Sequence, residues 1–402
     1  MKLKIASLLA ASVASAILAS PVLAQIKACI TVSATGPGAS LGVPEQNTIA
    51  LLPKEIGGQP VSYASFDDAT DPTAAAKNVR KCIEEQKADV LIGSSTTPTS
   101  IAVAGVAAET ATPLITLAPV GVPPEAEKWT FRTPQQVGQM AGAIIQHMKA
   151  KGVKTLGFIG YSDGYGELWL KVLEKALKEA GIEMAPVERF ARNDTSVTGQ
   201  VLKIVAAKPD AVLVVASGTP AALPNLAFAE RGYKGQIYHT HGSASLDFIR
   251  VAGKSAEGTI LPVGPVVVAD QLPASHPSKQ IGMDYTKAYE EKYGKGSLSS
   301  FGGHMFDAAQ LLAATIPVAL TKAKPGTPEF RAALRDALEN MKEVVGVHGV
   351  FNTSASDHYG HDERSRVLIR SRAAPGHLEI LDRAGMAESG HGASKLVGLA
   401  RR

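Results

Sequence analysis

The sequence has no block of charge of one sign. Its 41 Lys and Arg residues and 37 Asp and Glu residues are spread along 402 positions and leave a net charge of +4. Nucleic-acid-binding proteins carry basic patches or stripes, so the sequence gives that function little support. Beyond residue 24 there is also no apolar run of about 18 residues, the length that a membrane-spanning helix needs. With 45% hydrophobic residues, the composition predicts a soluble globular protein of roughly two to three domains.

The chain also lacks a His-Glu-x-x-His helix and a Walker loop. We therefore interpret it as a binding protein without a cofactor and not as an enzyme. The alternative, a hydrolase, would need Ser95 or Thr97 as nucleophile beside His241. His358 and His361 lie three residues apart between aspartates, a spacing that invites a metal. Mixed Asp and His turns are common surface loops, so we expect no metal site there.

Cysteine is scarce as well, because only Cys29 and Cys82 occur. Cys29 lies in a predicted strand (26–32), and Cys82 in the helix after the second predicted strand. In a right-handed doubly wound sheet that helix crosses over the first strand, so a disulfide is geometrically possible. The alternative is two buried thiols that pack as small hydrophobic residues.

The N-terminus has the pattern of a secretory signal peptide over residues 1–24. Lys2 and Lys4 precede a short apolar stretch (5–20), and Ala24 provides the small residue at a cleavage site. We therefore expect a mature protein in the periplasm, where a disulfide is permitted.

One stretch organises the rest of the chain. A short apolar run (90–92) ends at Gly93, and a segment rich in hydroxyl residues (94–100) leads into an Ala-rich helix that ends at Glu109. The first amides of a helix have no intrahelical partner and carry partial positive charge. This pattern predicts a seat for a small anion such as a carboxylate. Alternatively, the hydroxyl residues form only a loop and a helix cap.

Strands and helices alternate through the first third of the chain. Asp71-Pro72 has the form of an N-cap followed by proline at the first helical position. The alternation predicts a doubly wound parallel sheet with helices on both faces, an α/β fold. Ligands of such sheets bind beyond the carboxyl ends of the strands, so three loops (33–42, 93–100 and 117–121) should share one rim.

A second alternating run follows the predicted helix 135–151 and predicts a second sheet with its own rim. Two such lobes facing each other form a cleft suited to a small ligand. Later segments are helical, then strand-like up to residue 381, and we expect a disordered tail over 383–402. The predicted strands of the two runs are 26–32, 61–65, 89–92, 113–117, 155–160, 211–216 and 236–238.

Several motifs together resemble the periplasmic leucine/isoleucine/valine-binding proteins, the type I solute-binding proteins of ABC importers. The resemblance implies two lobes joined by three crossing strands, a permease partner in the inner membrane and a monomer. Lobe 1 would comprise 25–132 and 264–345, and lobe 2 would comprise 133–263 and 346–382. The motifs are Thr35-Gly36-Pro37, Phe66-Asp67-Asp68, Leu91-Ile92-Gly93, Tyr165-Gly166-Glu167 and Ser255-Ala256-Glu257-Gly258.

The resemblance also implies the ligand residues. The family's carboxylate-binding turn matches Ser95, Thr96 and Thr97, and its ammonium-binding carbonyl matches Ala118. The family's lobe-two tyrosine matches Tyr165. At two further tyrosine positions of the family, this chain has Leu41 and Ser217. It has Val120 at the family's hydroxyl position and His241 at the position of the acid that binds the ammonium group.

These departures predict a ligand without an ammonium group, because a desolvated ammonium needs a negative partner. The smaller residues leave space for a flat ring, for which Tyr161, Tyr165, Phe301 and Phe306 are candidate wall residues. Two segments (216–222 and 238–242) resemble a subgroup associated with benzoates and phenylpropanoids. We therefore expect an aromatic carboxylate, with a branched-chain or other amino acid or amide as the alternative.

Overall fold

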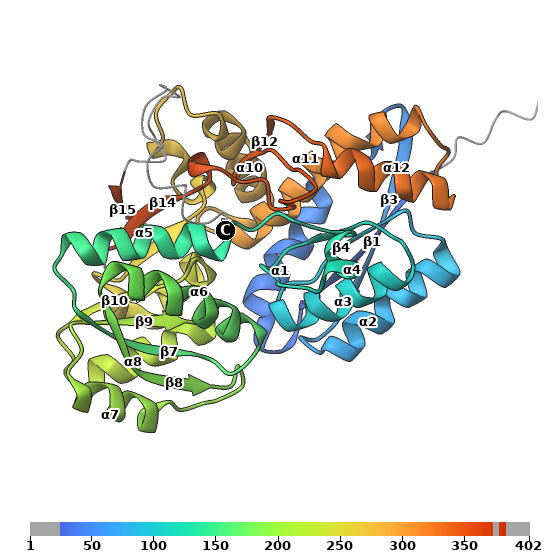
Figure 1. Cartoon of the computed structure of the whole chain (residues 1–402). Helices are drawn as coiled ribbons and strands as arrows, with labels where there is room; N and C mark the ends of the chain where they lie inside the picture. Colours follow the sequence, from blue (N-terminus) through green and yellow to red (C-terminus); the bar gives the residue numbers. More distant parts are fainter. Residues whose placement is uncertain (1–24, 373–377, 383–402) are drawn as a thin grey trace, which may run out of the picture.

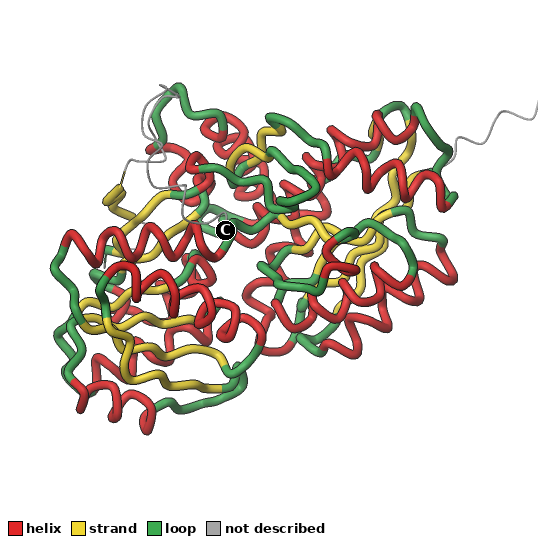
Figure 2. The backbone as a smooth tube through the Cα atoms, in the orientation of Figure 1, coloured by secondary structure: helices red, strands yellow, loops and turns green. Residues whose placement is uncertain are grey.

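The computed structural model describes residues 25–372 and 378–382 (Figure 1). The predicted signal peptide and C-terminal tail lie outside the described residues. Two lobes lie side by side, each built on a sheet flanked by helices (Figure 2). None of the described helices is long and apolar enough to cross a membrane.

The first lobe contains a six-stranded sheet in the order β2-β3-β1-β4-β5-β6. All neighbouring strands are parallel except the antiparallel pair β2 and β3, so the predicted parallel sheet is confirmed. The strands are β1 (Ile26–Val32), β2 (Glu55–Ile56), β3 (Gln59–Asp67), β4 (Val90–Gly93), β5 (Leu114–Thr116) and β6 (Thr130–Arg132).

Successive residues of each strand point to opposite faces of the sheet, so the apolar strands supply two cores. On one face, Leu91 and its neighbours pack against α2 (Pro72–Lys81) and α3 (Thr97–Glu109). On the other face, Ile92 and its neighbours pack against two helices from later in the chain, α11 (Ser300–Leu320) and α12 (Pro328–Glu339).

The start of α2 confirms the predicted cap. The Asp71 carboxylate accepts a hydrogen bond of 2.7 Å from the backbone N–H of Ala74, and Pro72 occupies the first turn. Helix α1 (Ala39–Thr48) precedes a short 3-10 turn (Ile49–Leu51).

The second lobe contains a seven-stranded sheet in the order β15-β14-β11-β10-β9-β7-β8, parallel except at β14 and β15. Its strands are β7 (Thr155–Tyr161), β8 (Glu183–Phe190), β9 (Ala211–Val215), β10 (Gln236–His239), β11 (Ile260–Val263), β14 (Val367–Ser371) and β15 (Leu378–Asp382). Helices α5 (Val137–Ala150), α6 (Gly164–Ala180), α7 (Thr198–Ala207) and α8 (Ala222–Glu230) flank this sheet.

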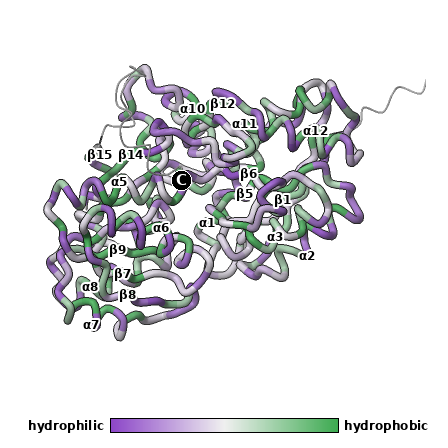
Figure 3. The backbone as a smooth tube through the Cα atoms, viewed as in Figure 1, coloured by the Kyte–Doolittle hydropathy of each residue, from purple (hydrophilic) through white to green (hydrophobic). Residues whose placement is uncertain are grey.

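Helix α5 alternates between hydrophobic and hydrophilic stretches (Figure 3), as expected of a helix with one face against a sheet. Strand β8 and helix α7 were not predicted. Strand β8 is an edge strand in which every residue except Phe190 is at least partly exposed, so its sequence has no continuous apolar run.

Among the described residues, three further α-helices and a hairpin follow β11. Helix α10 (Ser278–Tyr293) precedes α11 and α12, and strands β12 (Val344–Gly346) and β13 (Gly349–Phe351) form a separate antiparallel pair. Phe351 lies in the core beneath the first sheet, and the chain rejoins the second sheet at β14. The lobe boundaries at 132, 263 and 345 remain proposals.

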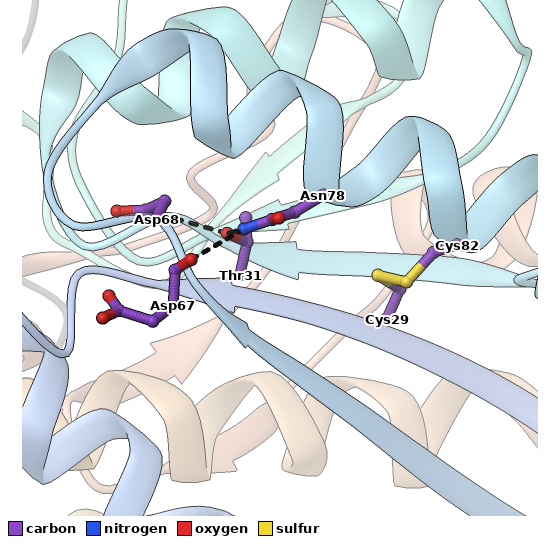
Figure 4. The surroundings of a disulfide bond; sticks show 6 residues. All are labelled: Cys29, Thr31, Asp67, Asp68, Asn78 and Cys82. Carbon is purple, nitrogen blue, oxygen red and sulfur yellow. Dashed lines mark hydrogen bonds between the residues drawn. A yellow bond between two sulfur atoms is a disulfide. The ribbon is translucent and has the colours of Figure 1, made fainter.

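The two cysteines form a disulfide between β1 and the turn that follows α2 (Figure 4). The Cα atoms of Cys29 and Cys82 are 6.1 Å apart, across a sequence separation of 53 residues. The bond links the first strand to the helix that crosses it. Of the two alternatives that the sequence left open, the cysteines therefore form a disulfide and are not two buried thiols.

Candidate functional site

A cavity between the lobes is lined by the carboxyl-terminal ends of strands from both sheets. All predicted ligand residues except Val120 line it. The first lobe and the adjoining helix α11 contribute Leu41, Ser95, Thr96, Thr97, Leu117, Ala118, Pro119, Phe301 and His304, and the second lobe and its linker contribute Pro134, Tyr165, Arg192, Ser217, His241 and Gly242.

The hydroxyl turn after β4 leads into the N-terminus of α3, as predicted. Gly93 has φ +123°, and a Cβ atom there would lie 2.0 Å from the Thr31 carbonyl oxygen, so only glycine fits. Thr96 is the extended N-cap residue, and Thr97 begins the helix. Pro98 has no N–H, and the Thr99 N–H bonds to the Thr96 side chain. The Thr97 N–H and the positive end of the helix are therefore what α3 presents to an anion in the cavity.

The hydroxyls of this turn are already hydrogen-bonded within the protein. Thr97 donates to the Pro119 carbonyl at 2.8 Å, and the Thr96 and Thr99 hydroxyls are 2.8 Å apart. Thr97 thus holds together the two loops that follow β4 and β5. The sequence-based expectation of hydroxyls turned toward the ligand is therefore incomplete, because each also has a partner inside the lobe.

Ser95 connects the cavity to a buried carboxyl of α1. Its Oγ accepts a hydrogen bond of 2.8 Å from the Ser33 N–H and forms a short one with Glu45. Burial raises the pKa of Glu45 well above its usual value, and the carboxylate of Asp68 raises it further, while the Ser95 hydrogen bond lowers it. No local sequence pattern predicts this contact, because Glu45 is 50 residues away from Ser95.

The wall of the second lobe carries a cation that sequence reasoning missed. Arg192 follows β8; its Nε donates to Asp163 at 2.5 Å and its Nη1 to the Ser217 hydroxyl at 2.9 Å. Its guanidinium stacks on the ring of Tyr161 at 4.1 Å. Arg192 lines the cavity, so its guanidinium lies within reach of a ligand there. If strand β8 had been predicted from the sequence, Arg192 would have been expected at the carboxyl ends of the strands of the second sheet, beside the cavity.

Two buried histidines face the same cavity. The Nδ1 atoms of His241 and His304 have no hydrogen-bond partner among the described residues. Burial lowers the pKa of His241 to about 4 and that of His304 well below its usual value, so both rings are neutral. A neutral imidazole can donate or accept a hydrogen bond, which suits a polar group on a ligand.

Tyr165 forms part of the wall between these groups. It lies in the first turn of α6, capped by Asp163, and its hydroxyl donates to Thr240 at 2.8 Å. Phe301 lies in the first turn of α11 on the opposite side. Tyr165, Phe301 and Leu41 provide the large apolar surfaces of the lining.

Three residues named from the sequence do not line the cavity. Val120 is buried, and its carbonyl accepts hydrogen bonds of 3.1 Å from both Arg132 Nε and the Tyr359 hydroxyl, which hold this segment against β6. The ring of Tyr161 lies beneath Arg192, and Phe306 packs against Tyr285 on α10. Both aromatic rings therefore pack against other side chains of the protein and do not form the cavity wall.

The lobes touch beside the cavity. The Thr219 N–H donates to the Ser40 hydroxyl at 3.0 Å, across the gap between the lobes. Gly218 has φ +63°, and a Cβ atom there would lie 2.1 Å from the Ser40 hydroxyl oxygen. The lobes are therefore in direct contact here, and this close approach requires a glycine at position 218.

The two histidines considered for a metal are engaged by the protein. His358 Nδ1 lies 2.9 Å from the Glu127 carbonyl, and His361 bonds to the Ser365 hydroxyl and the Thr133 carbonyl. The described residues contain no group of three or more His, Cys, Asp or Glu suited to a metal. These histidines hold the C-terminal loop against the linker between the lobes.

One motif was overlooked in the sequence. Residues 160–164 read Gly-Tyr-Ser-Asp-Gly, which matches Gly-x-Ser-x-Gly between a strand and a helix. A nucleophilic serine needs a base within hydrogen-bond reach. Ser162 is exposed, and no histidine hydrogen-bonds to its hydroxyl in the described chain. The motif therefore has the sequence and the strand-to-helix position of a nucleophile turn, but no base in the described chain.

A model of the periplasmic binding protein family matches residues 25–363. The chain belongs to the periplasmic binding protein family. This confirms the family resemblance, and the two-lobed α/β fold is the type I fold expected from it.

Solved structures extend this comparison. This periplasmic binding protein is 50% identical to an extracellular ligand-binding receptor from Rhodopseudomonas palustris HaA2, over 89% of this chain and 100% of that one, with a TM-score of 0.87. A leucine-binding protein from Thermotoga maritima is 19% identical over 89% of this chain and 98% of that one (TM-score 0.76). A solute-binding protein of an R. palustris ABC transporter, solved with benzoate, is 22% identical over 89% of this chain and 95% of that one (TM-score 0.73). No curated protein matches the chain.

Proposed function

We propose that this protein is the periplasmic substrate-binding component of an ABC transporter and captures a small aromatic carboxylate such as a benzoate or phenylpropanoid. Lobe closure around the ligand produces the form that a membrane permease recognises. The mature protein acts as a monomer, exported by the signal peptide over residues 1–24. It performs no chemical reaction on its ligand.

The observation that carries this proposal is the charge of the cavity lining. The lining residues include Arg192 and the N-terminus of α3 but no Asp or Glu. An amino acid would have to bury its ammonium group without a negative partner, which costs several kcal/mol. A carboxylate without an ammonium group meets the Arg192 guanidinium and the N-terminus of α3 among the lining residues, and both stabilise a negative charge.

The fold itself does not choose between the two ligand classes. The relatives of this fold include one named as a leucine-binding protein and one solved with benzoate, and both are less than 25% identical to this chain. The side chains of the cavity therefore carry the argument. Leu41, Tyr165 and Phe301 suit a flat ring, and the neutral His241 and His304 suit a polar substituent on it.

Closure follows from ligand contacts with both lobes. The ligand carboxylate binds the first lobe at the N-terminus of α3, and Arg192 then reaches it from the second lobe. Because the ligand interacts with both walls only in the closed form, it shifts the population toward that form. The Ser40–Thr219 hydrogen bond forms at the same time.

Isothermal titration calorimetry with benzoate, 4-hydroxybenzoate, cinnamate and leucine tests the proposal. We expect tight binding of at least one aromatic acid and none of leucine. Tight leucine binding without binding of the acids would favour the amino-acid alternative. Incubation of the protein with a generic ester tests the hydrolase alternative, and no turnover is expected.

A further inference from the structure

The carboxyl of Glu45 lies directly behind the part of the cavity wall that Ser95 forms. It is completely buried on α1, and its Oε1 has no hydrogen-bond partner among the described residues. Asp68, the neighbouring buried acid, accepts four hydrogen bonds. Their donors are the hydroxyls of Thr31, Ser33 and Ser94 and the backbone N–H of Thr70. The carboxyl group of Asp68 therefore accepts several hydrogen bonds from the protein, whereas that of Glu45 has Ser95 as its hydrogen-bond partner through Oε2 alone.

The hydrogen bonds of Ser95 limit what it can offer a ligand. A hydroxyl has one proton to donate and two lone pairs that accept. The Ser33 N–H occupies one lone pair. If Glu45 is ionised, Ser95 must donate its only proton to Glu45, and nothing remains for a ligand carboxylate. If Glu45 is a neutral acid, it donates to the second lone pair, and the Ser95 proton is free to point into the cavity.

We propose that Glu45 is a neutral carboxylic acid in the ligand complex, donates its proton to Ser95 Oγ, and so directs the Ser95 hydroxyl proton to the ligand carboxylate. Glu45 is then a positioning residue that acts through Ser95. The inference rests on the proposed function, because it requires an anionic ligand at Ser95. It makes ligand binding and protonation of Glu45 mutually dependent.

The surroundings of Glu45 agree with a neutral acid. Burial raises the pKa of Glu45, the neighbouring Asp68 carboxyl raises it further, and a ligand carboxylate in the cavity would act in the same direction. Tyr285 of α10 faces α1 through its hydrogen bond with Thr48, and His304 of α11 lines the same cavity as Ser95. Burial keeps both neutral, because it lowers the pKa of His304 and raises that of Tyr285. Neither can supply a positive charge to Glu45.

The infrared spectrum of the protein reports the protonation of Glu45 directly. With saturating benzoate or cinnamate at pH 7, the wild-type protein should have a protonated-carboxyl band that is absent in Glu45→Gln. Each of these ligands has a single ionisable group, which stays ionised from pH 6 to pH 9. A complex in which Glu45 is ionised would overturn the proposal.

Calorimetry tests the coupling. Where infrared spectra show Glu45 ionised in the ligand-free protein, the wild-type affinity should fall about tenfold per pH unit, with uptake of one proton on binding. Glu45→Gln, whose amide always donates to Ser95, should have a flat profile and no proton uptake. An affinity that stays constant while Glu45 ionises would refute the coupling.

Asp307→Asn is the matched control. Burial raises the pKa of Asp307 to about 8, but this carboxyl accepts hydrogen bonds from Val347 and His348 and does not touch Ser95. The variant should keep the wild-type pH profile. If Asp307→Asn flattened the pH dependence of the affinity and Glu45→Gln left it unchanged, Asp307 and not Glu45 would be the group that titrates. That result would overturn the proposal. Failure of both ligands to bind would instead count against the proposed function.

Discussion

Replacement of Arg192 by Met removes the cation from the cavity and leaves a side chain of similar length. The Arg192 side chain is 11% exposed, so its charge is largely desolvated. A hydrogen bond between charged groups in such a place contributes about 1.5–3 kcal/mol. Arg192→Met should therefore weaken the binding of benzoate or cinnamate by about 10- to 150-fold, since about 1.4 kcal/mol corresponds to tenfold.

Arg189→Met is the matched control, because Arg189 lies three residues earlier and points to solvent. Its ion pair with Glu167 has exposed fractions of 44% and 54% and contributes little to stability. Calorimetry should give Arg189→Met the wild-type affinity. Equal losses in the two variants would show that Arg192 contributes only to the general charge of the lobe.

Arg192→Met also leaves Asp163 without its ion-pair partner, which could weaken binding indirectly. The double variant Arg192→Met/Asp163→Asn removes both charges and keeps a side chain that can cap α6. If Arg192 binds the ligand, the double variant still binds the carboxylates weakly, while its affinity for the neutral benzamide changes much less. Recovery of carboxylate affinity in the double variant would refute a direct role.

Four further predictions concern the site and the fold. Thr97→Val should weaken ligand binding in calorimetry without a loss of the folded circular dichroism spectrum, because the hydroxyl holds the Pro119 loop. Gly218→Ala should hinder closure, since its Cβ would collide with Ser40, and small-angle scattering with ligand should report a more open form. Cys82→Ala should lower the free energy of unfolding in urea by about 4 kcal/mol, the chain-entropy value for a loop of this length. Burial lowers the pKa of His361 to about 4, below its unfolded value of about 6.5, so its stabilising contribution should be lost as the pH falls from 6.5 to 4 in acid titrations of stability.

Local signals in the sequence were enough for much of the first rim. The turn after β4 was predictable because glycine, hydroxyl residues and an Ala-rich run succeed each other within the chain. The N-cap at Asp71 was predictable for the same reason, since a cap involves neighbours only. The order of parallel strands then brought the loops at their carboxyl ends to one edge without any knowledge of side-chain contacts.

The features that give the cavity its chemistry depend on contacts between distant residues. Arg192 reaches the cavity from an edge strand whose partly exposed residues give no apolar pattern. Glu45 meets Ser95, and Cys29 meets Cys82, across about 50 residues, and no local pattern encodes such distances. Val120 lies in the loop after β5, as a residue of the cavity wall should. Its carbonyl, however, accepts hydrogen bonds from Arg132 and Tyr359, which hold the residue outside the cavity lining.

The sequence by itself therefore determined the two-lobed fold and the glycine and hydroxyl turn before α3, because hydrophobic periodicity and helix capping act over a few residues. Only the tertiary structure decided which charged and hydrogen-bonding groups surround that turn. Desolvation and hydrogen bonding depend on what packs against each group, and packing between distant segments exists only once the chain is folded.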